Sequence, residues 1–166
     1  MDNIKIYEIA PKYIDYLSLY APHLFHNKQK NQTFERKYIG VIFQVNGFNY
    51  FAPLSSFKAK HQKMKEGIDF IKVKNYAVIN LNNMFPVPEG EYTYVNINAE
   101  KDPQYRALLL AEYRFIKSIQ TRIRKNAQAI YRIKIKDGES TPLAKRCNDF
   151  EALETACAQY SSPVQK

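Results

Sequence analysis

Residues 38–54 read YIGVIFQVNGFNYFAPL, two apolar runs that flank the pair Asn46-Gly47. Asn-Gly is the dipeptide that best accommodates the positive φ angles of a two-residue hairpin turn. The segment therefore predicts a β-hairpin with strands over residues 38–45 and 48–54. Pro53 cannot donate a backbone hydrogen bond, so we expect the second strand to lie at a sheet edge or to end near this residue.

Hydroxyl and basic side chains gather at the outer ends of this hairpin. Arg36 precedes the first strand, and the second strand is followed by Ser55, Ser56, Lys58 and His61. Because antiparallel pairing brings the two outer ends together, we expect these residues to form one site. Side chains of these types hold a phosphate group or move a proton. Serine is also common in turns, so the hydroxyls alone would not indicate a site.

Short apolar segments on either side of the hairpin predict further strands. They cover residues 3–9, 69–74, 76–81 and 91–97. Their links are mostly of hairpin length, so we expect a strongly curved, mostly antiparallel sheet of about five or six strands. The polar residues 22–37 should form a long exposed loop.

The second half of the chain has helical periodicity. Pro103 suits a first helical turn, and Asp102 lies beside the helix N-terminus. Apolar residues then recur at intervals of three and four from Tyr105 to Ile130, which predicts one long helix packed on the sheet. The alternating segment IYRIKI, residues 130–135, fits either a helix or a strand.

Shorter helices are expected over residues 11–20 and 149–160. With 166 residues, 45% of them apolar, the chain can bury a substantial core. We therefore expect an α+β protein that forms one compact domain over residues 1–166.

The net charge of +9 favours a polyanionic partner. Nucleic acid is preferred over a membrane surface because no strongly amphipathic basic helix stands out. Many basic proteins are merely soluble, and that alternative stays open. The longest apolar run, residues 107–111, is too short to span a membrane, and no N-terminal segment resembles a signal peptide. Cys147 and Cys157 are too few for a disulfide framework or a zinc site, so we expect reduced thiols in a cytoplasmic protein.

Positive charge is concentrated in residues 101–136, which hold ten Lys or Arg against two acids. A charge run is usually a solvated face, but this imbalance exceeds what ion pairs within a helix can absorb. We therefore expect a track for a phosphate backbone. The candidate nucleic-acid contacts along the chain are Lys37, Lys60, Lys63, Lys65, Arg106, Arg114, Lys117, Arg122, Arg124 and Lys125. Aromatic candidates for stacking on unpaired bases are Tyr38, Tyr76, Tyr92 and Tyr94.

Four segments occur in an informative order. They are IKIYEI followed by a Tyr-rich helix, Arg36 two residues before Tyr38-Ile39-Gly40, the block Tyr-x-Ala-Pro-Leu-Ser-Ser-x-Lys over residues 50–58 with His61 after it, and VINLNNMFPVP over residues 78–88. Between about residues 4 and 125 the chain thereby resembles the ToxN/AbiQ family, CptN/TenpN-like relatives included. Members of this family are endoribonuclease toxins of type III toxin-antitoxin systems, and they are linked to phage resistance. Their antitoxin is an RNA.

The resemblance implies roles for four residues. Ser56 matches the central catalytic serine and would contact the 2′-hydroxyl or the scissile phosphate. Ser55 matches a supporting hydroxyl, and Lys58 matches a lysine that would stabilise growing negative charge. Arg36 stands where relatives carry Lys or Arg, and its guanidinium could hold two phosphate oxygens. Relatives usually have Pro directly after the serine, whereas this chain has Phe57.

The chemistry of RNA cleavage fits this small set of residues. The chain has no Gly-rich phosphate loop, no HExxH and no GxSxG elbow. The ribose 2′-hydroxyl is an internal nucleophile, so a few hydroxyls and cations suffice. The products would be a 2′,3′-cyclic phosphate and a 5′-hydroxyl end, and neither a metal nor a cofactor is expected, as the resemblance also implies. His61 could be a general acid or base or could only bond to its loop, and both readings stay open.

The first hypothesis is a sequence-selective endoribonuclease that cleaves cellular single-stranded RNA and is inhibited by a small structured RNA antitoxin. The resemblance implies that this RNA bridges toxin subunits in a closed protein–RNA assembly. The alternative is a non-catalytic RNA-binding protein that uses the same basic face. A third possibility is a hydrolase of small phosphate esters.

Overall fold

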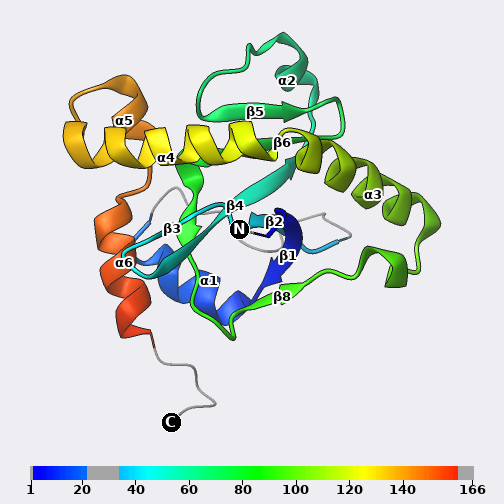
Figure 1. The fold of residues 1–166 in the computed structure, drawn as a ribbon, viewed down its shortest axis with the longest axis horizontal. Helices are drawn as coiled ribbons and strands as arrows, with labels where there is room; N and C mark the ends of the chain where they lie inside the picture. The colour runs from blue at the N-terminus through cyan, green and yellow to red at the C-terminus, as the bar shows by residue number, and fades with distance from the viewer. Residues whose placement is uncertain (1, 22–33, 161–166) are drawn as a thin grey trace.

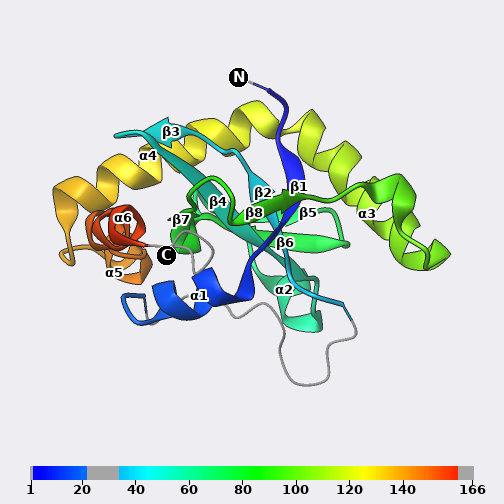
Figure 2. The same cartoon turned by 90° about the horizontal axis from the view of Figure 1, so that it is seen from below.

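An antiparallel β-sheet runs through the centre of the protein, and helices cover both of its faces (Figure 1; Figure 2). The computed structural model describes residues 2–21 and 34–160. The continuous part of the sheet has the strand order β5 (Phe70–Val73), β6 (Ala77–Asn80), β4 (Phe48–Ser56), β2 (Lys37–Gly40), β1 (Lys5–Ile9) and β8 (Tyr92–Tyr94). Two short strands, β3 (Gln44–Val45) and β7 (Phe85–Pro86), pair with β4. The predicted α+β fold with an antiparallel sheet is confirmed.

The predicted hairpin turn is present at Asn46-Gly47. Both residues have positive φ angles, 53° and 82°, and Val45 pairs with Phe48 across the turn. The first predicted strand, however, is divided into β2 and β3. Ile39 pairs with Ala52, and Gln44 pairs with Asn49. Between these two pairs the β2–β3 side of the hairpin advances five residues, whereas β4 advances only three. This bulge bends the hairpin, and no turn signal in the sequence marks it.

Pro53 lies inside a central strand, so the prediction of a sheet edge or a strand end is wrong. β4 continues three residues beyond it and lies between β2 and β6. Tyr50 exchanges backbone hydrogen bonds with Ile42 and Phe43, and Pro53 therefore turns its nitrogen to the opposite side of β4. On that side the neighbouring strand changes from β7 to β6. The nitrogen of Pro53 therefore points to the place where β4 changes its partner strand, and no backbone hydrogen bond of the sheet is lost there.

The helices begin where the sequence supplies caps. They are α1 (Pro11–Ser18), α2 (Ala59–Lys63), α3 (Pro103–Ser118), α4 (Gln120–Asp137), α5 (Pro142–Arg146) and α6 (Phe150–Gln159). Asp102 and Asp149 accept backbone hydrogen bonds at the starts of α3 and α6. Two 3-10 turns, η1 (Leu81–Asn83) and η2 (Ile97–Ala99), complete the described elements. The predicted strand over residues 91–97 is shortened to β8 because η2 follows it.

The predicted long helix is two helices, which lie end to end at an angle across the sheet (Figure 1). Ile119 separates them with φ −114° and ψ 13°. The Gln120 side chain accepts a hydrogen bond from Ile4 N and donates one to Asn3, which ties this junction to the start of the sheet. Apolar periodicity continues through the junction, so the sequence does not reveal it. The ambiguous segment, residues 130–135, is helical because α4 extends to Asp137.

Buried apolar side chains pack on both faces of the sheet. One group joins it to α3 and α4 and includes Ile6, Ile39, Ile79, Ile116 and Ile123. The other joins it to α1 and α6, on the opposite side in Figure 2, and includes Tyr13, Leu17, Tyr38, Phe51 and Leu153. Tyr38 is thus fully buried, and its prediction as an exposed stacking residue is wrong.

Most of the predicted polar loop, residues 22–33, lies outside the described residues. At its end the prediction of exposure is wrong, because Arg36 and Lys37 are buried. Among the helices of the described ranges, none has the length and apolar character needed to cross a membrane.

Candidate functional site

Arg36 and Ser55 meet at the open end of the β2–β4 pair. The register pairs Lys37 with Leu54, so the preceding Arg36 falls opposite Ser55. The Arg36 Nη1 donates a hydrogen bond of 3.0 Å to Ser55 Oγ. Burial lowers the pKa of Arg36, yet a guanidinium keeps its charge in proteins. The hairpin thus brings a permanent cation and a hydroxyl together, as the sequence predicted.

Two cavities open on either side of this contact. Arg36, Ser55 and Ser56 line both of them. We call the first the basic cavity. It has a volume of about 270 Å³ and is lined by Arg36, Ser55, Ser56, Lys58, Lys60, His61, Met64, Phe70, Val78, Asn80 and Asn83. We call the second the aromatic cavity. It has a volume of about 370 Å³ and is lined by Phe34, Glu35, Arg36, Lys37, Leu54, Ser55, Ser56, Tyr76, Ala77, Tyr105, Leu108, Leu109 and Glu112.

The basic cavity has the charge of an anion site. Arg36, Lys58 and Lys60 line it, and none of its described lining residues is an acid. Ser56 is exposed there, and its hydroxyl makes no hydrogen bond to any part of the chain that the structure describes. Cations and a hydroxyl around one small hollow can bind a phosphate group. All five residues predicted as catalytic, His61 included, line this cavity.

His61 supports the segment that carries Lys58. Its Nδ1 accepts a 2.8 Å hydrogen bond from the backbone N–H of Lys58, and its ring contacts the rings of Phe57 and Phe70. Burial, together with Lys60 and Lys58, lowers the pKa of His61. The imidazole is therefore neutral near pH 7, with its proton on Nε2. Since Nδ1 is occupied, this geometry favours a supporting role for His61 over that of a base acting through Nδ1.

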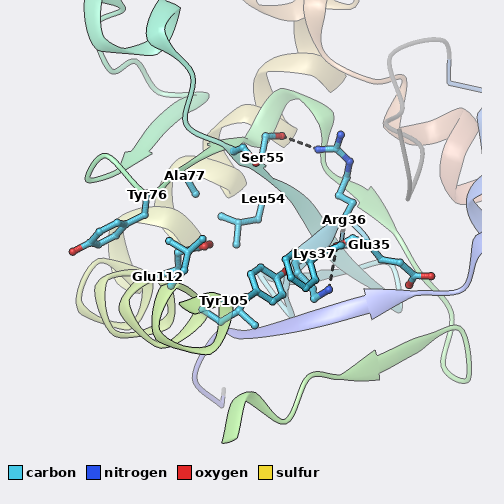
Figure 3. A pocket seen from close by; sticks show the side chains of 13 residues that line it. Glu35, Arg36, Lys37, Leu54, Ser55, Tyr76, Ala77, Tyr105 and Glu112 are labelled. Atoms are coloured by element: carbon cyan, nitrogen blue, oxygen red, sulfur yellow. Dashed lines mark hydrogen bonds between the residues drawn. The ribbon is translucent and has the colours of Figure 1, made fainter. Parts of the chain in front are cut away.

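The aromatic cavity contains a carboxyl that sequence reasoning missed (Figure 3). Glu112 is only 5% exposed, and burial raises its pKa to about 8. Phe34 and Tyr105 stack in parallel at 3.8 Å at one side of the cavity. A signal for Glu112 does exist in the sequence. It lies three residues after Leu109 and four before Ile116, so it is an acid on the apolar stripe of α3.

The residues predicted to contact nucleic acid differ in their surroundings. Seven are exposed: Lys60, Lys63, Lys65, Arg114, Lys117, Arg122 and Lys125. Lys60 lines the basic cavity. Four of the ten bind protein groups: Lys37 pairs with Glu8 at 2.9 Å, Arg106 donates to Glu100 O, the exposed Arg122 pairs with Glu66 at 3.4 Å, and Arg124 donates to the carbonyls of Ile42 and Asp2. Part of the positive charge of the second half therefore holds the fold together.

Metal-binding geometry is absent from the described residues, which contain no group of three or more His, Cys, Asp or Glu side chains placed to hold an ion. The cations that face the basic cavity are side chains of the protein itself.

Comparison with known proteins gives consistent matches over almost the whole chain. A family model described as Toxin ToxN, type III toxin-antitoxin system, matches residues 5–158. Endoribonuclease ToxN from Bacillus thuringiensis subsp. kurstaki is 34% identical over 173 residues, covering 99% of this chain and 88% of that protein. Endoribonuclease AbiQ from Lactococcus lactis subsp. lactis is 26% identical over 172 residues, covering 96% and 90%.

Solved structures agree with these matches. A structure described as showing selective toxin inhibition by a non-coding RNA pseudoknot in type III systems has a TM-score of 0.83 and 31% identity, covering 96% of this chain and 98% of that one. The structure of AbiQ, a lactococcal anti-phage endoribonuclease, has the same fold, with a TM-score of 0.83 at 21% identity and coverage of 96% and 98%. The motifs, the fold and these matches agree, and the chain belongs to the ToxN family of type III toxin-antitoxin toxins.

Proposed function

We propose that this protein is a sequence-selective endoribonuclease toxin that cleaves single-stranded RNA in the cytoplasm. Its relatives ToxN and AbiQ carry the name endoribonuclease. The observation that carries the proposal is the arrangement of Arg36, Ser55, Ser56 and Lys58 around one basic cavity. A single phosphate in that cavity can contact hydroxyls and cations together.

The reaction is an internal transesterification. The ribose 2′-oxygen loses its proton and bonds to the adjacent phosphorus, and the bond from phosphorus to the 5′-oxygen breaks. The 5′-oxygen takes up a proton. The products are a 2′,3′-cyclic phosphate and a 5′-hydroxyl end. The protein has to hold the phosphate in line with the 2′-oxygen and to stabilise the negative charge that grows on it.

Each residue has a distinct part in this step. Ser56, exposed in the basic cavity, donates a hydrogen bond to a phosphate oxygen or orients the 2′-hydroxyl. Arg36 and Lys58 neutralise charge on the pentacoordinate phosphate. Ser55 accepts from Arg36 and so fixes the direction of the guanidinium, and its own proton is available to donate. These side-chain cations would do the work that a metal ion does in other nucleases.

The same cavity would bind the inhibitor. We propose a small structured RNA as the antitoxin, since one solved relative is described as inhibited by a non-coding RNA pseudoknot. Its backbone would occupy the basic cavity and block substrate, while exposed cations such as Lys63, Lys65 and Arg114 would hold flanking phosphates. An RNA that bridges two toxin copies in this way would give a closed protein–RNA assembly.

The decisive experiment compares wild type with Ser56→Ala on single-stranded RNA. We expect Ser56→Ala to lower the cleavage rate by about 100-fold or more while RNA affinity changes little. The matched control is Ser118→Ala, because within residues 2–21 and 34–160 the Ser118 Oγ bonds only to its own helix, at Phe115 O. Wild-type ends should be a 5′-hydroxyl and a cyclic phosphate, and cleavage should persist in a metal chelator.

An inactive wild type that still binds RNA would instead indicate the non-catalytic RNA-binding alternative. Turnover of a small phosphate ester without RNA cleavage would indicate the third possibility.

A further inference from the structure

The aromatic cavity adjoins the proposed phosphate site directly. Arg36, Ser55 and Ser56 form a common wall between it and the basic cavity. In RNA each base is joined to its phosphates through one ribose. A phosphate that contacts this wall from the basic side therefore has a base within reach of the aromatic side.

The lining of the aromatic cavity suits a flat heterocycle. Leu54, Ala77 and Leu108 supply apolar surface, and the rings of Tyr76 and Tyr105 lie on either side of Glu112 in Figure 3. Apolar and aromatic walls combined with a small number of polar groups are the usual composition of a small-ligand site. Proteins that bind single-stranded RNA hold unstacked bases against aromatic side chains and hydrogen-bond to their edges.

Among the charged groups that line this cavity, the carboxyl of Glu112 is the most buried, at 5% exposure. Within the described residues it has neither a hydrogen-bond partner nor an ion pair. The cation that acts on it electrostatically, Lys37, is already bound to Glu8 at 2.9 Å and to Glu35 O at 3.0 Å. A buried carboxyl without a partner is unfavourable. The Glu112 oxygens are not among the fully enclosed, unpartnered side-chain atoms of the described residues, so they open to the cavity, where a ligand can supply the hydrogen bonds that the protein does not.

We propose, resting on the nuclease function above, that the aromatic cavity receives the unpaired base next to the cleaved phosphate and that the Glu112 carboxyl hydrogen-bonds to its Watson–Crick edge. Glu112 would then be a specificity residue of the nuclease, outside the set of groups that act on the phosphate.

The proton on Glu112 determines which base fits. A neutral carboxyl offers one donor and one acceptor, which match the amino group and ring nitrogen at the edge of adenine or cytosine. An ionised carboxylate offers acceptors only. It repels that ring nitrogen and pairs well with the two adjacent N–H donors of guanine. Because burial raises the pKa of Glu112 to about 8, the ratio of adenine to guanine accepted by this cavity should fall as the pH rises through that value.

Other titratable groups near the cavity do not interfere with the pH range in which Glu112 changes its charge. The charged or titratable residues that line the cavity beside Glu112 are Glu35, Arg36, Lys37, Tyr76 and Tyr105. Burial opposes the charge of Lys37, but its hydrogen bond to Glu8 raises its pKa overall. Burial raises the pKa of Tyr105. Across the wall, the lowered pKa of His61 keeps it neutral throughout the range.

The test uses a pool of single-stranded RNA with a randomised central window, and cut sites are mapped by sequencing. Wild type, Glu112→Gln and Glu112→Leu are compared at about pH 7 and pH 9, and an incubation without protein corrects for alkaline cleavage. Glu112→Gln is always neutral and keeps one donor and one acceptor. Glu112→Leu suits a buried position and removes both.

We expect wild type to show a base preference at a position flanking the cut, with an adenine-to-guanine ratio that falls about fivefold or more between the two pH values. In Glu112→Gln this preference should persist without the pH change. In Glu112→Leu it should disappear, while preferences at other positions remain. Equal preferences in all three proteins would overturn the assignment of Glu112 and leave the nuclease function standing. Absence of any Ser56-dependent cleavage would overturn both.

Discussion

The Arg36 guanidinium donates a 3.0 Å hydrogen bond to Ser55 Oγ, although the two residues are 19 positions apart in the chain. The contact depends on the β2–β4 register, in which the neighbouring pair is Lys37 and Leu54. It lies on the wall between the two cavities. The direction of the guanidinium is therefore set by a hydroxyl that itself borders the proposed phosphate site.

This contact predicts non-additive kinetics for Arg36 and Ser55. Arg36→Ala should lower kcat/KM by about 100-fold, since it removes a charge-stabilising donor. Ser55→Ala should have a smaller effect, and most of that effect should vanish in the Arg36→Ala background. The double-mutant cycle should give a coupling energy of about 0.5–3 kcal/mol. Additive effects would show that Ser55 does not act through Arg36.

His61 gives a prediction for stability against pH. Its pKa is lowered by burial and by the neighbouring lysines, so the unfolded chain binds a proton more readily than the folded one. Stability from this residue is fully present above pH about 6.5 and is lost as the pH falls through the folded-state pKa. Thermal unfolding measured at about pH 5 and pH 7 should show a lower Tm at the acidic value, and His61→Gln should reduce the difference. The same difference in both proteins would contradict this assignment.

His61 also gives a kinetic prediction. Loss of the acceptor for the Lys58 N–H should lower kcat/KM in His61→Ala by about tenfold, through the position of Lys58. His61→Asn can restore an acceptor and should recover part of the activity. If His61 were instead the general base, the wild-type cleavage rate would rise with pH as His61 loses its proton, and both variants would abolish that rise.

The meeting of Arg36 with Ser55 was predictable from the sequence because one turn sets it. Asn46-Gly47 fixes where the chain reverses, and antiparallel pairing then brings the outer ends together. The division of the first strand was not predictable. It results from a bulge between Ile39 and Gln44 that is defined only by which residues pair across β4. The continuation of β4 past Pro53 depends on its pairing with β7 and β6, so it was not predictable from the sequence either.

The second half of the chain shows a different limit. Counting charges predicted a phosphate track, but charge alone does not indicate which cations bind protein groups. Arg124, for example, donates to carbonyls of Ile42 and Asp2, which lie far from it in sequence. Glu112 was overlooked because helical periodicity was followed through apolar residues alone. An acid on the buried stripe of α3 was the observable signal.

Gly40 provides a test of the packing between β2 and β4. A Cβ atom at this position would overlap the ring of Phe51, which is fully buried. Gly40→Ala should therefore lower the free energy of unfolding by about 1–3 kcal/mol. The matched control is Gly67→Ala, because the nearest atom to its Cβ would be Asp69 Oδ1 at 3.6 Å. Denaturant unfolding of both variants checks this, and equal stabilities would contradict the predicted overlap.

The carboxyl of Glu112 should make the free protein less stable than it could be at neutral and alkaline pH. Burial raises its pKa to about 8 from the ordinary value of 4.5. Its stabilising contribution is complete below pH 4.5 and is lost as the pH rises to about 8, where the folded state also ionises. Glu112→Gln, which cannot ionise, should therefore raise the free energy of unfolding near pH 7 by up to about 3 kcal/mol. Denaturant unfolding at about pH 5 and pH 8 measures the effect, and the gain should be larger at the higher pH.

A variant less stable than wild type at pH 8 would show that the ionised carboxylate has a partner in the folded protein. A gain in stability combined with altered base preference would mean that the chain gives up stability at this position in return for base recognition.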